Sequence, residues 1–143
     1  MEKNILALDL GKGSLGIALS RSGLFVTPLR ELRFKMMDFN SALASLQEML
    51  RFEKVEVIAM GYPTYPSGDP CEMTPIVEKF IPKVQALFPQ AKLVKVDERN
   101  STLEAAAMLH ANGQSAKKQH GRIDSAAAMV ILERYLRSIG QAE

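Results

Sequence analysis

Hydrophobic and polar positions alternate with two different periods along this chain. Short apolar runs bounded by turns predict β-strands, whereas apolar residues that recur every three or four positions predict the buried face of a helix. The runs that predict strands are 4–9, 14–20, 24–32, 55–61 and 91–97. The segments with helical spacing are 38–51, 74–87, 101–112 and 123–139.

The connections between these elements predict how the strands pair. A glycine-rich turn follows residue 9 and RSG follows residue 20, so the first three strands are expected to form an antiparallel meander. The later strands alternate with helices, which is typical of parallel strands joined by crossovers. Pro28 places the third strand at an edge or marks a bulge. The predicted fold is α/β, with a mixed five-stranded sheet flanked by helices and a single domain over residues 1–143.

Local signals predict where the helices begin and where a loop intervenes. Thr74 and Pro75 suit the N-cap and first position of the helix predicted at 74–87. Asp124 is expected to open the last helix. Between the last two helices, the segment QSAKKQHGR (114–122) is polar and basic and is expected to be a loop.

Composition narrows the class of protein. The chain has 143 residues, of which 47% are hydrophobic and 24% charged, as in ordinary globular proteins. Cys71 is the only cysteine, which excludes an internal disulfide and Cys-rich zinc sites and favours a cytoplasmic location. No apolar run is long enough to cross a bilayer, so no membrane partner is expected. The net charge of +2 does not by itself indicate a polyanionic partner.

Acidic residues stand where the strands end. Asp9 closes the first strand, Asp97 and Glu98 close the last, and Asp124 heads the final helix, which can pack across the sheet near both. The C-terminal ends of parallel strands meet at one sheet edge, so these carboxylates are expected to converge. Such oxygen ligands suit Mg²⁺ or Mn²⁺, and a pair of these ions can promote phosphodiester hydrolysis.

Each acid also has a purely structural explanation. Asp124 could be a helix cap, and Asp97 and Glu98 could be surface charges. Asp9 favours a functional interpretation, because an acid in so apolar a strand lowers stability unless it is paired or bound to metal.

Four sequence blocks together resemble the YqgF/RuvX family. They are LALDLGKGSLGIALS (6–20), GYPTYPSGDP (61–70), VDERNSTLEA (96–105) and IDSAAAMVILERYL (123–136), in the family's order and spanning nearly the whole chain. The resemblance implies an RNase H-like fold in small bacterial proteins that are described as Holliday junction resolvases and as nucleases that finish the 5′ end of 16S rRNA. It matches Asp9, Glu98 and Asp124 to the family's acids. It also matches Gly11, Gly16, Gly61, Pro63, Gly68 and Arg99 to conserved positions of the motif blocks.

The chain departs from the family pattern around these acids. Lys12 and Gly13 stand where the family has Thr-Lys, and Asn100 replaces a leucine. Tyr62, Thr64 and Tyr65 replace aliphatic and amide positions of the second block. All three acids are present, so the departures concern how nucleic acid is seated rather than metal binding.

These observations lead to one hypothesis about the site. Asp9, Glu98 and Asp124 hold Mg²⁺ or Mn²⁺ and hydrolyse a phosphodiester; the preference for Glu98 over Asp97 rests on the family pattern and on neighbouring strand residues facing opposite ways. Backbone phosphates are expected at six residues: Gly11, Lys12, Arg99, Lys117, Lys118 and Arg122. For the basic cluster a solvated loop is the alternative, and for Tyr62 and Tyr65 packing is the alternative to stacking on bases.

Several functional alternatives stay open. A phosphate-binding ATPase of the actin and sugar-kinase type shares the first loop but requires two such domains, which 143 residues do not accommodate. A non-catalytic nucleic-acid-binding module is the other rival. The metal centre acts on the phosphodiester alone, so the sequence does not choose between pre-rRNA and branched DNA as partner. Junction resolution would favour a homodimer, whereas end trimming needs only a monomer.

Overall fold

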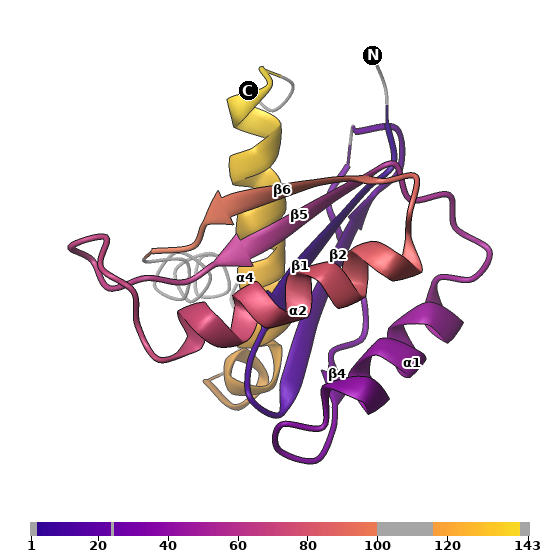
Figure 1. Cartoon of the computed structure of the whole chain (residues 1–143). Helices are drawn as coiled ribbons and strands as arrows, with labels where there is room; N and C mark the ends of the chain where they lie inside the picture. Colours follow the sequence, from indigo (N-terminus) through magenta and orange to yellow (C-terminus); the bar gives the residue numbers. More distant parts are fainter. Residues whose placement is uncertain (1–2, 24, 100–115, 141–143) are drawn as a thin grey trace.

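The computed structural model describes residues 3–23, 25–99 and 116–140, with side chains in the last range described from residue 126. A mixed sheet lies between helices on its two faces (Figure 1). The strands are β1 (Ile5–Leu10), β2 (Ser14–Ser20), β3 (Thr27–Pro28), β4 (Leu32–Arg33), β5 (Val57–Tyr62) and β6 (Lys92–Asp97). The helices are the short 3₁₀ turn η1 (Arg21–Gly23), α1 (Phe39–Met49), α2 (Met73–Leu87) and α4 (Ala116–Ser138). The helix predicted at 101–112 lies outside the described residues.

The sheet has the order β3-β2-β1-β5-β6, and β4 also pairs with β2. β2 runs antiparallel to β1, β3 and β4, whereas β5 runs parallel to both β1 and β6. The mixed α/β class and the parallel crossovers are therefore confirmed, but the sheet has six strands instead of the predicted five.

The sixth strand arises because the predicted strand 24–32 is broken in two. Ala18 pairs with Pro28, and Leu15 pairs with Leu32. Between these two pairs β2 has two residues, whereas the partner segment has three. The extra residue is a β-bulge, and it follows Pro28, which has no N–H to donate to a ladder. Pro28 thus lies on the edge strand and next to a bulge, and both expectations from the sequence hold.

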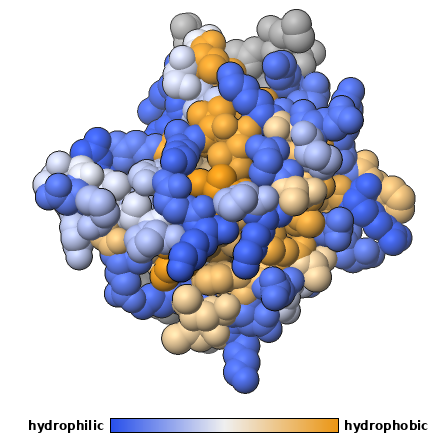
Figure 2. All heavy atoms as spheres, in the orientation of Figure 1, coloured by the Kyte–Doolittle hydropathy of each residue, from blue (hydrophilic) through white to orange (hydrophobic). Residues whose placement is uncertain are grey.

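Both faces of the sheet are buried, which explains the nearly continuous apolar run of β1. On one face α1 and α2 cover a core that includes Leu6, Leu8 and Phe80. On the other face α4 packs across β2 and β1 over a core that includes Ile131. In Figure 2, hydrophilic residues cover much of the face on which α1 and α2 lie, and hydrophobic residues show between them. None of the helices within the described ranges is both long and apolar enough to cross a membrane.

The start of α2 differs from its prediction. The helix begins at Met73 with Glu72 in the N-cap position, so Thr74 is not the cap. The buried Thr74 hydroxyl instead accepts a hydrogen bond from the Cys71 N–H (2.9 Å) and donates one to the Pro63 carbonyl (2.6 Å). The side chain therefore ties the loop after β5 to the first turn of the helix, which a local capping pattern does not reveal.

Candidate active site

Asp9 lies near the end of β1, which is a central strand of the sheet. It is opposite Gly16 of β2 and half-buried, whereas its neighbours Leu8 and Leu10 are buried. The strand is apolar because it is covered on both faces, so Asp9 interrupts a pattern that packing alone would continue. A carboxylate in this position lowers stability unless it has a specific partner.

Glu98 follows the last residue of β6 and turns toward the same part of the sheet. The parallel register pairs Tyr62 with Asp97, and the Glu98 N–H continues the ladder toward the Tyr62 carbonyl (3.5 Å). The carboxylate then lies directly above Gly61 of β5. A Cβ atom at residue 61 would come within 2.1 Å of Glu98 Oε2 and 2.6 Å of Ile131 Cδ1, so only glycine leaves room for the acid.

The two carboxyl groups interact strongly. The pKa of Glu98 is raised to about 9, chiefly by burial and then by the negative charge of Asp9 and a hydrogen bond with Asp9. The nearby Cys71 acts in the same direction, whereas Arg134 opposes it. Without a cation, Glu98 is therefore protonated at neutral pH and shares its proton with Asp9. Adjacent acids with such a shift are typical of functional sites.

The donor set at this position fits a hard divalent cation. Glu98 Oε2 is buried and has no hydrogen-bond partner among the described residues, and the Glu98 side chain interacts with the carboxylate of Asp9. Mg²⁺ and Mn²⁺ bind preferentially to oxygen ligands, above all to carboxylates whose negative charge is not balanced by another cation. Within the described residues, no cluster of three or more His, Cys, Asp or Glu side chains suitable for a metal is present. The Asp124 side chain is outside that set, so the third predicted ligand stays a prediction.

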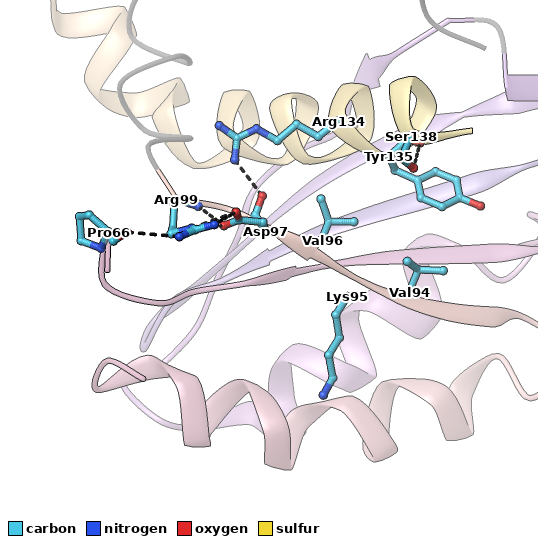
Figure 3. Close-up of a pocket in the computed structure, with 9 residues that line it drawn as sticks. All are labelled: Pro66, Val94, Lys95, Val96, Asp97, Arg99, Arg134, Tyr135 and Ser138. Carbon is cyan, nitrogen blue, oxygen red and sulfur yellow. Dashed lines mark hydrogen bonds and ion pairs between the residues drawn. The ribbon is translucent and has the colours of Figure 1, made fainter. Parts of the chain in front are cut away.

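Asp97 faces away from Asp9, although it precedes Glu98 directly. Its carboxylate accepts hydrogen bonds from Arg99 Nε (2.9 Å) and Nη2 (2.7 Å), and these bonds lower the pKa of Asp97 (Figure 3). Arg99 Nη1 also donates to the Pro66 carbonyl (3.2 Å), and Arg134 donates to the Asp97 carbonyl (2.8 Å). This network joins the end of β6 to the 62–70 loop and to α4. Arg99 therefore joins the end of β6 to the 62–70 loop, and its predicted contact with phosphate stays a prediction.

Gly11 and Lys12 form the turn that brings Asp9 to the site. The Gly11 N–H donates to the Ser14 carbonyl (2.8 Å), and a Cβ at residue 11 would lie 3.0 Å from Ser14 Oγ. Neither Gly11 nor Gly13 has a positive φ, so close approach of atoms, not a left-handed backbone, accounts for glycine at position 11. The Lys12 ammonium forms an exposed ion pair with Glu72.

The structure corrects the prediction for the last helix. α4 begins at Ala116, so most of the predicted basic loop is helical and Asp124 lies inside the helix instead of opening it. Lys117, Lys118 and Arg122 belong to its first two turns, and their side chains lie outside the described residues. The sequence signal was misleading because Asp124 and Ser125 resemble a cap.

The two tyrosines of the second block differ in their surroundings. Lys95 lies over the ring of Tyr62, with Nζ 4.9 Å from the ring centre, and a hydrogen bond with Glu78 raises the pKa of Tyr62. One face of that ring is thus already occupied, which favours the packing alternative. Tyr65 is 55% exposed, so stacking on a base stays a prediction for this residue.

Sequence reasoning missed the contribution of two residues near the acids. Arg134 reaches the backbone of Asp97 from α4, and nothing in its helical spacing marks it as different from other surface arginines. Cys71 lies close enough to raise the pKa of Glu98, and its own pKa is lowered chiefly by a hydrogen bond with Thr74. Both depend on contacts between segments that are distant in the sequence.

Comparisons with known proteins show which family the chain resembles. A protein of Onion yellows phytoplasma named "Putative pre-16S rRNA nuclease" is 34% identical over 131 residues, covering 92% of this chain and 87% of that protein. A protein of the same name from Chlorobaculum tepidum is 32% identical over 139 residues, covering 95% and 94% of the two chains.

Among solved structures, the chain resembles T. thermophilus RuvC in complex with a Holliday junction substrate. The TM-score is 0.60 with 13% identity, and the match covers 99% of this chain and 98% of that one. This likeness confirms the predicted RNase H-like fold. Residues 3–138 match the family model RuvX, described as Holliday junction resolvase. The chain therefore belongs to the RuvX family of nucleases.

Proposed function

We propose that this protein is a divalent-metal-dependent nuclease that processes the 5′ end of pre-16S rRNA. The observation that carries the proposal is the pair of carboxyl groups of Asp9 and Glu98, one of which has a buried oxygen without a hydrogen-bond partner among the described residues. Such a pair is costly for the fold, and a cation between the two groups removes the cost. The names of the relatives support the RNA substrate.

Asp9 and Glu98 would hold Mg²⁺ or Mn²⁺, and Asp124 is the third proposed ligand. When bound, the ion supplies positive charge to the phosphodiester and lowers the pKa of a water molecule. The protein contributes the position of its acids: the sheet register places Glu98 above Gly61, and the turn after β1 places Asp9.

The remaining residues orient the nucleic acid. The Lys12–Glu72 ion pair is exposed on both sides, and such pairs contribute at most about 1 kcal/mol, so a phosphate can compete for the ammonium. Arg99 uses part of its guanidinium to hold Asp97 and the 62–70 loop in place. We assign Lys117, Lys118 and Arg122 to the phosphate backbone as well, on the basis of their charge.

Holliday junction resolution is the second candidate function. It is supported by the description of the family model. Cleavage of a junction requires two opposed active sites, which a homodimer would supply, whereas processing of an RNA end requires one. A nucleic-acid-binding role without cleavage is the third candidate.

One experiment separates the three candidates. The purified protein is incubated with Mg²⁺ or Mn²⁺ and, separately, with an RNA that carries an unprocessed ribosomal 5′ end, a four-way DNA junction and a single-stranded oligonucleotide. Cleavage of the RNA at its 5′ end supports the proposal, and symmetric cleavage of the junction supports the second candidate. Binding without cleavage of any substrate identifies a binding module.

Variants test the site itself, by calorimetric titration with Mn²⁺ alongside cleavage. Asp9→Asn and Glu98→Gln should lose both Mn²⁺ binding and cleavage. Asp69→Asn changes an exposed acid of the 62–70 loop and should retain both. Full activity of the Asp9→Asn variant would exclude the proposed site.

A further inference from the structure

A second basic feature lies at the opposite end of the sheet from the acids. Lys3 precedes β1, Lys54 precedes β5 and Lys92 begins β6, and all three line one depression of about 550 Å³. Figure 1 shows why they meet: the three parallel strands start side by side, away from the ends that carry Asp9 and Glu98. We name this feature the lysine depression.

The floor of the lysine depression is well ordered by backbone hydrogen bonds. The N–H of Glu56 donates to the Asn4 carbonyl (3.0 Å), and the Lys92 N–H donates to the Glu56 carbonyl (3.0 Å). On the side formed by the end of α2, Gln85 donates to the carbonyls of Phe88 (3.0 Å) and Ala91 (2.9 Å). The lysines therefore project from a rigid frame.

The charge of the lysine depression is not neutralised locally. Among the described residues, none of its three lysines forms an ion pair, in contrast to Lys95, which pairs with Glu78 (2.7 Å). Glu56 is the one acid in the lining, and one of its oxygens already accepts the Asn4 N–H (3.1 Å). Three positive charges against one negative charge make an anion-attracting surface on a chain whose net charge is only +2.

The distance to the acids suits an extended polyanion. Lys3 and Asp9 are six residues apart along β1 and the residues before it, or about 20 Å at about 3.3 Å per residue. With the rise of about 3.4 Å per base pair of B-form DNA as a guide, a nucleic-acid duplex spans this distance with about six base pairs. The edge strand β6 connects the two regions directly, from Lys92 at the depression to Asp97 beside the acids.

We propose that the lysine depression binds the phosphate backbone of the nucleic-acid substrate at a point remote from the bond that is cleaved. This inference rests on the proposed function for the identity of the polyanion. It adds a second contact that anchors the substrate along β6. The affinity for nucleic acid then has two contributions, one from the end of the sheet that carries the acids and one from the lysine depression.

The test measures binding to a long RNA stem with a 5′ extension, by fluorescence anisotropy over a series of salt concentrations. Measurements are made in the Asp9→Asn background so that the substrate stays intact. The triple variant Lys3→Gln, Lys54→Gln, Lys92→Gln should lower the slope of log affinity against log salt by about 2 to 3, since each phosphate contact contributes about 0.7 to 0.9. Glu56→Gln should change affinity in the opposite direction and tighten binding.

A matched control removes the same charge elsewhere. Lys35, Lys79 and Lys83 are exposed residues outside the lysine depression, and their triple change to Gln should leave the slope within about one unit of its original value. An equal decrease of the salt slope in the two triple variants would overturn the inference, because the loss of net charge alone would then explain the decrease. An unchanged slope in the depression variant would overturn it as well. Failure of the unmodified protein to bind or cleave any nucleic acid would refute the proposed function instead.

Discussion

Replacing the titratable carboxyl of Glu98 by an amide should make the protein more stable than the wild type without metal and less stable than the wild type with metal. The folded pKa of Glu98 is raised from 4.5 to about 9, chiefly by burial and then by the charge of Asp9. Between these two values the folded state holds a proton that the unfolded chain has released. The stability contributed by this group is therefore complete below pH 4.5 and is lost as the pH rises toward 9.

The size of the effect follows from linkage. Each pH unit above 4.5 lowers the free energy of unfolding by about 1.4 kcal/mol, so the loss at pH 7 is at most about 3.5 kcal/mol. Glu98→Gln keeps the shape of the side chain and needs no proton uptake on folding. Without metal, the variant should be about 1 to 3 kcal/mol more stable than the wild type at pH 7, with the difference shrinking toward pH 4.5.

Addition of Mn²⁺ should reverse this order. A ligand at one hundred times its dissociation constant stabilises the folded state by about 2.7 kcal/mol, and only the wild type retains both acids. The assay is urea denaturation at a low and a neutral pH, in EDTA and in Mn²⁺. Asp97→Asn is the matched control from the adjacent position: it should keep the response to Mn²⁺, because Asp97 faces Arg99.

A contrary result is easily recognised. If Glu98→Gln is less stable than the wild type in EDTA at neutral pH, the carboxyl is not held protonated beside Asp9. If both proteins respond equally to Mn²⁺, Glu98 is not a ligand.

Three further changes test the surroundings of the acids. Gly61→Ala places a methyl group where Glu98 lies, so Mn²⁺ affinity measured by calorimetry should fall about tenfold or more; unaltered affinity would contradict the geometry. Thr74→Val removes the hydrogen bonds of the Thr74 hydroxyl with Pro63 and Cys71, which should cost about 1 to 3 kcal/mol in urea denaturation and raise the pKa of the Cys71 thiol as measured by its alkylation rate against pH. A thiol pKa that stays unchanged would mean that Thr74 does not act on it. Arg99→Gln should release the 62–70 loop and speed its proteolysis, with Mn²⁺ binding kept; equal proteolysis would show that the Arg99 contacts do not restrain the loop.

Much of the fold was predictable because local patterns of apolar residues indicate most of its strands and helices. The buried strands β1 and β5 and the edge strand β6 are short apolar runs in the sequence, and the predicted apolar face of α1 includes its buried residues Leu43 and Leu46. The segment 24–32 was misjudged because one apolar run can hold two short strands with a bulge between them. The start of the last helix was misjudged because an Asp-Ser pair suits a cap as well as a helix interior.

The sequence by itself determined that an acid interrupts a buried strand and that other acids follow strand ends at Asp97 and Glu98. It also determined the order of elements and, through the motif blocks, the family. Only the tertiary structure decided that Glu98 is the residue that faces Asp9, while Asp97 turns to Arg99. Neighbouring residues on a strand point to opposite sides, so this choice depends on the register between β5 and β6. That register arises from long-range packing, and it also makes Gly61 the residue that leaves space for the carboxylate.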